Sequence, residues 1–292
     1  MAKSTKSLLL LVGVLIVSNF FIWRATSAEI PNSILKVYFL DIGQGDATFI
    51  ESPNGNQVLI DGGPGRKVLS ELSEIMPAYD KSIDVVLSTH TDMDHLGGLV
   101  EVLKSYSVSA VIGNGFIAQT NIYKNWEESV SQSRNTRKTV RAGDRIVLDH
   151  NIVFDVLGPT AEDFSPEPKG ANEVMIVGKL RYGEKTFLFM GDLERADEIR
   201  LTQSGADLKS DVLKVAHHGS KYSSTDFFLD RVHPKYAAIS VGSTNHYGHP
   251  TSETLERLNK INAQVLRTDQ SGRIIFTSDG VAISLLTENP IQ

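Results

Sequence analysis

The chain has 292 residues, with 35 acidic and 29 basic side chains and a formal charge of −6. About 22% of its residues are charged and 41% are hydrophobic, which is ordinary for a globular protein. It has no cysteine, which excludes a disulfide scaffold, a cysteine-based zinc finger and a cysteine nucleophile. Any metal site must therefore use His, Asp and Glu. The acidic balance argues against a protein that coats duplex nucleic acid by bulk charge.

Residues 1–28 have the pattern of a secretory signal peptide or an uncleaved signal anchor. Lys3 and Lys6 precede the uncharged stretch Leu8–Trp23, and small residues ending at Ala28 follow. The stretch is shorter than the ~20 residues of a spanning helix, which favours cleavage near Ala28. A buried N-terminal helix is the alternative, but the stretch is apolar on every face. We expect an extracytoplasmic protein, secreted or anchored by this segment to the outer face of the cytoplasmic membrane.

Beyond the leader, the pattern predicts one domain over residues 33–288, with strands and helices mixed along the chain. Apolar segments bounded by Gly, Pro, Asn or Asp indicate strands, and amphipathic segments indicate helices. We expect an α/β protein with mixed sheets and helices packed outside them. The predicted strands are Leu35–Leu40, Ala47–Glu51, Gln57–Ile60, Val85–Thr89, Ala110–Ile112, Asn151–Leu157, Glu173–Tyr182, Lys185–Met190, Val212–Ala216, Tyr236–Val241, Gln264–Arg267 and Arg273–Thr277. The predicted helices are Val68–Met76, Gly97–Tyr106, Leu193–Thr202, Asp226–Val232 and Ser252–Asn262.

Four potential metal ligands follow the strand that ends at Thr89. His90 and Asp92 should point to one side of an extended loop, and Asp94 and His95 should lie at the turn into a helix. The arrangement suits two metal ions, with one pair of residues on each. A charged surface loop with an Asp cap would explain one aspartate. It would not explain four potential ligand residues between an apolar strand and a diglycine.

Two later strand ends offer further ligands. Asp192 ends one strand and could cap a helix or bridge two metal ions with its two oxygens. His217 and His218 end another strand, where alternation lets only one of them face the site easily. The sequence does not decide between these two, although His217 is slightly favoured. His249, between Gly248 and Pro250, is a candidate ligand or general acid.

At this point the sequence resembles the metallo-β-lactamase superfamily. More closely, it is similar to the hydrolase domain of ComEC-type competence (DNA-uptake) proteins, and the likeness covers nearly all of residues 34–282. The matching motifs are Asp41–Asp46, Ile60–Gly63, the His90–Gly98 run with Thr89 in a serine place, Lys214–Ser220 and Tyr247–Pro250.

The resemblance implies an αββα sandwich with the metal centre at one edge of the two sheets. It implies metal ligands at one of the two neighbouring histidines His217 and His218 and at five further residues. These are His90, Asp92, Asp94, His95 and Asp192. Two departures stand out. Gly158 lies near the place of a histidine that often completes the first metal's shell, and Met175 stands where this branch usually has serine.

The expected chemistry is hydrolysis by a hydroxide that bridges two divalent ions, Zn²⁺ or Mn²⁺, and is held by Asp192. Asp94 and His249 are the expected catalytic residues. A ligand histidine needs an acceptor for its second ring nitrogen, and Asp61 is the candidate. Substrate contacts or outer support are expected from Asp46, Ser220, Lys221 and Asn245.

The expected substrate is a phosphodiester, above all DNA, and no protein partner is inferred. The alternatives are hydrolysis of another ester (a phosphocholine ester, a lactone or a β-lactam) and a non-catalytic binding module, which Gly158 keeps open. A local basic run could meet a nucleic-acid backbone, but a solvated loop leading into a strand is the favoured explanation. The run consists of Arg134, Arg137, Lys138, Arg141 and Arg145.

Overall fold

The computed structural model describes residues 11–19, 33–164 and 170–290. Residues 1–33 and residues 34–292 form separate compact units. Residues 11–19 are helical, and among the described residues no helix is both long and apolar enough to cross a membrane. Most of the predicted leader lies outside the described residues, so the leader and the domain limits stay predictions.

The strands form two mixed sheets. The first has the order β15-β14-β1-β2-β3-β4-β5-β6 and the second β13-β12-β11-β10-β9-β8-β7. The first sheet contains β1 (Leu35–Phe39), β2 (Thr48–Glu51), β3 (Gln57–Ile60), β4 (Ser82–Leu87), β5 (Ser107–Gly113), β6 (Thr136–Thr139), β14 (Ile274–Ser278) and β15 (Ile283–Thr287). The second contains β7 (Arg145–Asp149), β8 (Ile152–Gly158), β9 (Val177–Tyr182), β10 (Lys185–Phe189), β11 (Val212–Lys214), β12 (Tyr236–Ile239) and β13 (Gln264–Arg267).

Side-chain alternation explains why the sheets pack face to face. In β1, Val37 and Phe39 enter the core between the sheets, whereas Tyr38 points to the outer helices. In β10, Phe187 enters the same core and Leu188 points to the other side. Burial of apolar side chains on both faces therefore fixes each sheet as an inner layer.

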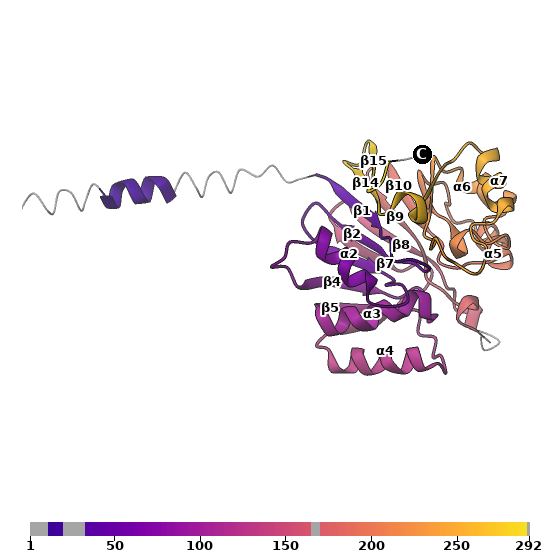
Figure 1. Ribbon diagram of the computed structural model, residues 1–292, viewed down its shortest axis with the longest axis horizontal. Helices are drawn as coiled ribbons and strands as arrows, with labels where there is room; N and C mark the ends of the chain where they lie inside the picture. Colours follow the sequence, from indigo (N-terminus) through magenta and orange to yellow (C-terminus); the bar gives the residue numbers. More distant parts are fainter. Residues whose placement is uncertain (1–10, 20–32, 165–169, 291–292) are drawn as a thin grey trace, which may run out of the picture. The chain divides into compact units, whose positions relative to one another are not determined.

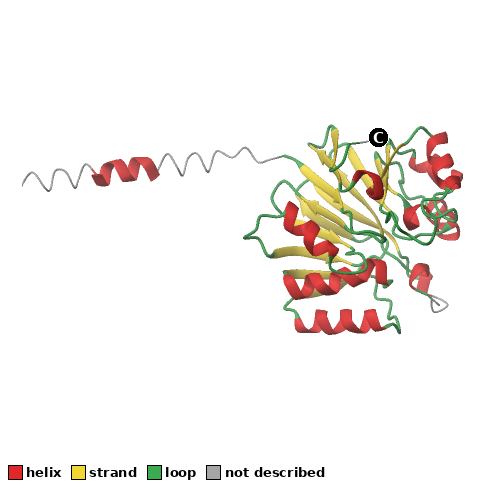
Figure 2. Cartoon of the chain, viewed as in Figure 1, coloured by secondary structure: helices red, strands yellow, loops and turns green. Residues whose placement is uncertain are grey.

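Helices cover the outer face of each sheet (Figure 1), and Figure 2 shows the strands between them. Helices α2, α3 and α4 pack on the first sheet, and α5, α6 and α7 pack on the second. The predicted αββα sandwich is confirmed. The helices are α2 (Lys67–Ile75), α3 (Met93–Ser105), α4 (Asn121–Gln132), α5 (Arg195–Gln203), α6 (Asp226–Val232), α7 (Ser252–Lys260) and α8 (Thr268–Ser271), with short 3-10 turns η1 (Glu162–Phe164), η2 (Ala171–Glu173) and η3 (Ala216–Gly219).

Some elements escaped the sequence prediction. Helix α4 was not predicted, and it buries Tyr123, Trp126 and Val130 along one face. Strand β6 was missed because all four of its residues are exposed, and only pairing with β5 defines it. The predicted strand Glu173–Tyr182 was too long, since its first residue belongs to η2 and β9 begins at Val177.

Parallel pairing brings several strand ends to one edge of the sandwich. Strand β3 pairs in parallel with β4, and β10, β11 and β12 pair in parallel with one another. The carboxyl ends of these strands lead into the loops that carry most of the predicted ligands.

Candidate metal centre

The first turn of α3 carries Asp94 and His95, and backbone contacts fix its position. The amide of Asp46 donates to the Asp94 carbonyl (3.0 Å), and the amide of Gly62 donates to the His95 carbonyl (2.8 Å). A Cβ atom on Gly98 would lie 1.8 Å from the Gly62 oxygen, so only glycine allows this close approach. The diglycine therefore sets where the two ligand side chains stand.

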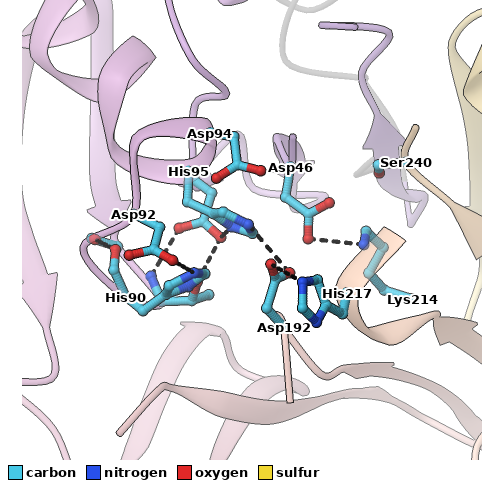
Figure 3. Close-up of polar contacts among 12 residues, drawn as sticks. Asp46, His90, Asp92, Asp94, His95, Asp192, Lys214, His217 and Ser240 are labelled. Carbon is cyan, nitrogen blue, oxygen red and sulfur yellow. Dashed lines mark hydrogen bonds and ion pairs between the residues drawn. The ribbon is translucent and has the colours of Figure 1, made fainter. Parts of the chain in front are cut away.

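The second sheet completes a four-residue group with Asp192 and His218. Ligand atoms of Asp94, His95, Asp192 and His218 all lie within 4.8 Å of one another. The Asp192 carboxylate is central, with His95 Nε2 at 3.2 Å and His218 Nε2 at 3.6 Å. In Figure 3 the labelled members of the centre point toward one another from both sheets.

His217 and His218 both face Asp192, which contradicts the expectation from strand alternation. Strand β11 ends at Lys214, and both histidines have left-handed backbones (φ 50° and 52°) in a turn, where alternation does not apply. His218 is buried and joins the four-residue group, whereas His217 Nε2 lies 3.8 Å from Asp192 Oδ2 at the rim of the site. The structure thus gives the central place to His218 and not to the slightly favoured His217.

Three buried imidazoles are each held through Nδ1. His218 Nδ1 donates to the Ser240 carbonyl (2.9 Å), and His95 Nδ1 to Asp61 Oδ2 (2.9 Å). The Thr89 hydroxyl donates to Asp61 (2.7 Å) and lies 3.0 Å from His90 Nδ1. Such support fixes the tautomer and the direction of a ligand histidine.

The donor set fits a divalent metal. The Nε2 atoms of His90, His95 and His218 and the Oδ1 atom of Asp192 are buried without a hydrogen-bond partner among the described residues. Buried polar atoms without partners are costly, and neutral imidazole nitrogens with carboxylates suit Zn²⁺ or Mn²⁺. His90 Nε2 lies 3.8 Å from the half-exposed Asp92.

Carboxylates around the centre raise the pKa values of two of its imidazoles. Burial lowers the pKa of His218, but Asp192 and Asp46 outweigh burial and raise it to about 10. Burial likewise opposes charge on His95, yet Asp192 and Asp61 raise its pKa well above the usual range. Burial would raise the pKa of Asp192, but His95 and His218 lower it. Both imidazoles therefore hold their protons more tightly than a free imidazole does.

Metal binding must displace these protons, so it depends on pH. The apparent affinity for Zn²⁺ should rise about tenfold per pH unit for each proton released between pH 6 and pH 8. Calorimetric titration of the chelator-treated protein in buffers of different ionisation enthalpy measures both the affinity and the protons. An affinity that stays constant across this range, with no proton release, would contradict the assignment of His95 and His218 as ligands.

Asp46 and Ser220 are both buried behind the centre, where their polar groups face other residues of the protein. Asp46 is 4% exposed, and its oxygens face Lys214 Nζ (2.8 Å) and His218 Nδ1 (3.2 Å). Ser220 is also buried, with its hydroxyl accepting the Tyr222 amide and its carbonyl accepting the Thr254 hydroxyl. Both residues support the centre from behind.

The loop after β12 brings His249 to the rim of the centre. The Asn245 side chain donates to the His249 carbonyl (2.8 Å) and accepts its amide (3.0 Å), so Asn245 holds the loop closed. The His249 ring contacts His217 with 5.7 Å between centroids. Lys221 is exposed and lies over the Tyr222 ring, where substrate could reach it.

The two departures from the family pattern lie beside one hollow of about 1270 Å³. Gly158 and Met175 both line this hollow, together with Asp92. A Cβ atom on Gly158 would meet no atom closer than 3.6 Å, so a side chain would fit there. Met175 is buried.

Four supporting residues were given no role by the sequence interpretation. They are Thr89 and Ser240, which hold the imidazoles, Lys214, which pairs with Asp46, and Glu194, whose carboxylate lies 3.5 Å from His217 Nδ1. Lys214 had a recognisable signal, since a lysine within an apolar strand needs a buried partner. Ser240 had none, because it acts through its carbonyl.

Residues 40–243 match the Metallo-beta-lactamase superfamily, and the chain belongs to it. The chain is 34% identical to ComE operon protein 3 of Bacillus subtilis over 263 residues, which cover 82% of this chain and 33% of that protein. It is 30% identical to Competence protein ComA of Neisseria gonorrhoeae (90% and 35% covered) and 31% identical to Recombination protein 2 of Haemophilus influenzae (85% and 30%). The chain thus spans about a third of the length of these relatives.

Solved structures share the fold. The metallo-beta-lactamase fold protein YhfI from Bacillus subtilis is 12% identical, with a TM-score of 0.57 and coverage of 84% of this chain and 99% of that chain. Zn(2+)-bound PqqB from Methylobacterium extorquens is also 12% identical, with a TM-score of 0.52 and coverage of 77% and 85%. The superfamily and the His/Asp group make the chain a metal-dependent hydrolase.

Proposed function

We propose that this protein is an extracytoplasmic phosphodiesterase that cleaves DNA strands. The observation that carries the proposal is the buried group of imidazoles whose free Nε2 atoms converge on Asp192. The likeness to competence proteins supports nucleic acid as the substrate, and the N-terminal pattern of residues 1–28 supports the location.

Two divalent ions would supply an activated water and would polarise the oxygens of the reacting phosphate. Asp94, His95, Asp192 and His218 would hold one ion, and His90 and Asp92 would hold the other. Asp61 orients the imidazole of His95, and the Ser240 carbonyl orients that of His218.

His249 would serve at the rim of this centre. Burial lowers the pKa of its imidazole, and His217 and His218 add to the effect. The ring is therefore neutral at neutral pH, which favours a ligand or a hydrogen-bond donor over a strong acid. Its Nδ1 atom is buried without a hydrogen-bond partner among the described residues, so it is free for either role.

The basic run contributes little to substrate binding in this proposal. Arg137 pairs with Glu127 and Arg145 with Asp155, while Arg141 donates to the Asn114 carbonyl and lies over the Phe164 ring. Strand β6 lies at the edge of its sheet, where exposed charges prevent pairing with another chain.

We therefore expect the double change Arg134→Ala with Lys138→Ala to leave DNA cleavage nearly unchanged. These two residues lack an ion-pair partner among the described residues, so their side chains are the ones in the run that are available to contact a phosphate. The slope of log(kcat/KM) against log[salt] should stay constant, whereas two lost phosphate contacts would reduce it by about 2. A slope reduced by that amount would assign the run to the substrate.

A panel of substrates tests the proposed function. The purified domain, loaded with Mn²⁺ or Zn²⁺, is incubated with single-stranded DNA, duplex DNA, bis(p-nitrophenyl) phosphate, a lactone and a β-lactam. Cleavage of DNA is the expected result. Turnover of a lactone or β-lactam with intact DNA would contradict the proposal and select the other ester hydrolases. Inertness toward all five, without bound metal by elemental analysis, would select a binding module.

A further inference from the structure

Two hollows flank the metal centre, and they differ in charge. The hollow of about 1270 Å³ is lined by six carboxylate side chains, and Arg200 is the one cation among its described lining residues. Arg200 is itself bound to Asp163 and Asp197. A polyanion is repelled from such a surface. The carboxylates are Asp92, Glu162, Asp163, Glu173, Glu194 and Asp197.

The second hollow, of about 380 Å³, is close to neutral. Its two acidic lining residues are both paired, Asp41 with Lys67 (3.0 Å) and Asp269 with Arg267 (2.6 Å). Gln44 lines the same hollow, and its Nε2 atom is buried without a hydrogen-bond partner among the described residues. The hollow thus offers a polar donor without repelling an anion.

An exposed aromatic ring connects this hollow to the metal centre. Tyr247 lines the hollow and is 71% exposed. Its ring stacks on His249 with 5.8 Å between centroids and 25° between planes. His249 contacts His217, whose Nε2 lies 3.8 Å from Asp192. Two successive ring contacts therefore connect Tyr247 to His217 at the rim of the centre.

We propose that the hollow of about 380 Å³ binds a nucleotide of single-stranded nucleic acid, with its base stacked on Tyr247 and its phosphate at the metal centre. The inference rests on the proposed function and adds the substrate class. Base stacking on an aromatic side chain needs an unpaired strand, because the bases of a duplex are already stacked on one another. The carboxylates of the acidic hollow repel the strand, which therefore binds in the hollow that Tyr247 lines.

The test measures binding without cleavage. A fluorescent, hydrolysis-resistant phosphorothioate DNA strand is titrated with the Mn²⁺-loaded protein. Tyr247→Ala should weaken binding about 5- to 150-fold, the range that base stacking of ~1–3 kcal/mol supports. Tyr247→Phe keeps the ring and should bind within about twofold of wild type, because stacking does not need the hydroxyl.

Tyr79→Ala is the matched control. Tyr79 is 89% exposed and lies before β4, at the end of that strand opposite the centre, so its loss should change nothing. Unchanged strand binding by Tyr247→Ala, or an equal loss for a duplex, would overturn the inference. Wild-type protein that cleaves duplex but not single-stranded DNA would overturn it and leave the proposed function standing. Absence of all DNA binding and cleavage would overturn both.

Discussion

Replacing Asp192 with asparagine should remove bound metal and lower kcat/KM by about 1000-fold or more, because the metal ions supply several kcal/mol of transition-state stabilisation. Asp192 is 3% exposed and faces three imidazoles of the site, those of His95, His217 and His218. The amide has the same shape but lacks the negative charge, so the change tests ligation and not packing. Elemental analysis and the phosphodiesterase assay together measure the effect.

Asp226→Asn provides the control for this variant. Asp226 forms a surface ion pair with Lys260 (2.8 Å) in the second half of the chain, and its loss should affect neither metal content nor kcat/KM. The melting temperature of the metal-free Asp192→Asn protein shows whether it folds. A folded Asp192→Asn protein that retains full metal content would contradict the account of the centre.

Lys214→Met should lower the free energy of unfolding by about 3–5 kcal/mol, because it leaves the carboxylate of Asp46 buried without its cation. Lys214 Nζ is 2.8 Å from Asp46 and 3.0 Å from the Val215 carbonyl, and both side chains are buried. Asp46 also contacts His218, so metal affinity should fall about 10- to 100-fold, as is usual for lost outer support. Chemical denaturation and metal titration measure the two effects.

Lys260→Met is the matched control for Lys214→Met. Its ion pair with Asp226 has the same length of 2.8 Å but is solvent-exposed, so we expect little measurable change in stability. Adding Asp46→Asn to Lys214→Met removes the unpaired charge and should recover part of the lost stability. If the single and the double variant were equally unstable, the loss would come from packing and not from the buried charge.

Much of the fold and the ligand set could be predicted from the sequence because the signals are local. The apolar strands before His90, Asp192 and His217 are visible as short runs, and each is followed closely by a residue that can bind a metal. The helix at the diglycine Gly97–Gly98 was also visible, although α3 begins at Met93 and not at the predicted Gly97. These features need no knowledge of the rest of the chain.

The remaining features depend on distant parts of the chain. The choice between His217 and His218 follows from a left-handed turn, which the strand pattern did not reveal. The supporting role of Asp46 depends on Lys214, which lies 168 positions later in the sequence. Strand β6 exists only through pairing with β5, because its own residues are polar and exposed. Tertiary context decides all three.

The most direct test of the central claim is mass spectrometry of single-stranded DNA treated with the protein in ¹⁸O-labelled water. The chelator-treated protein should leave the strand intact, and addition of Mn²⁺ should yield fragments with one ¹⁸O atom on a terminal phosphate. That result would show metal-dependent hydrolysis at phosphorus. An intact strand in the presence of protein that has bound its metal would contradict the account.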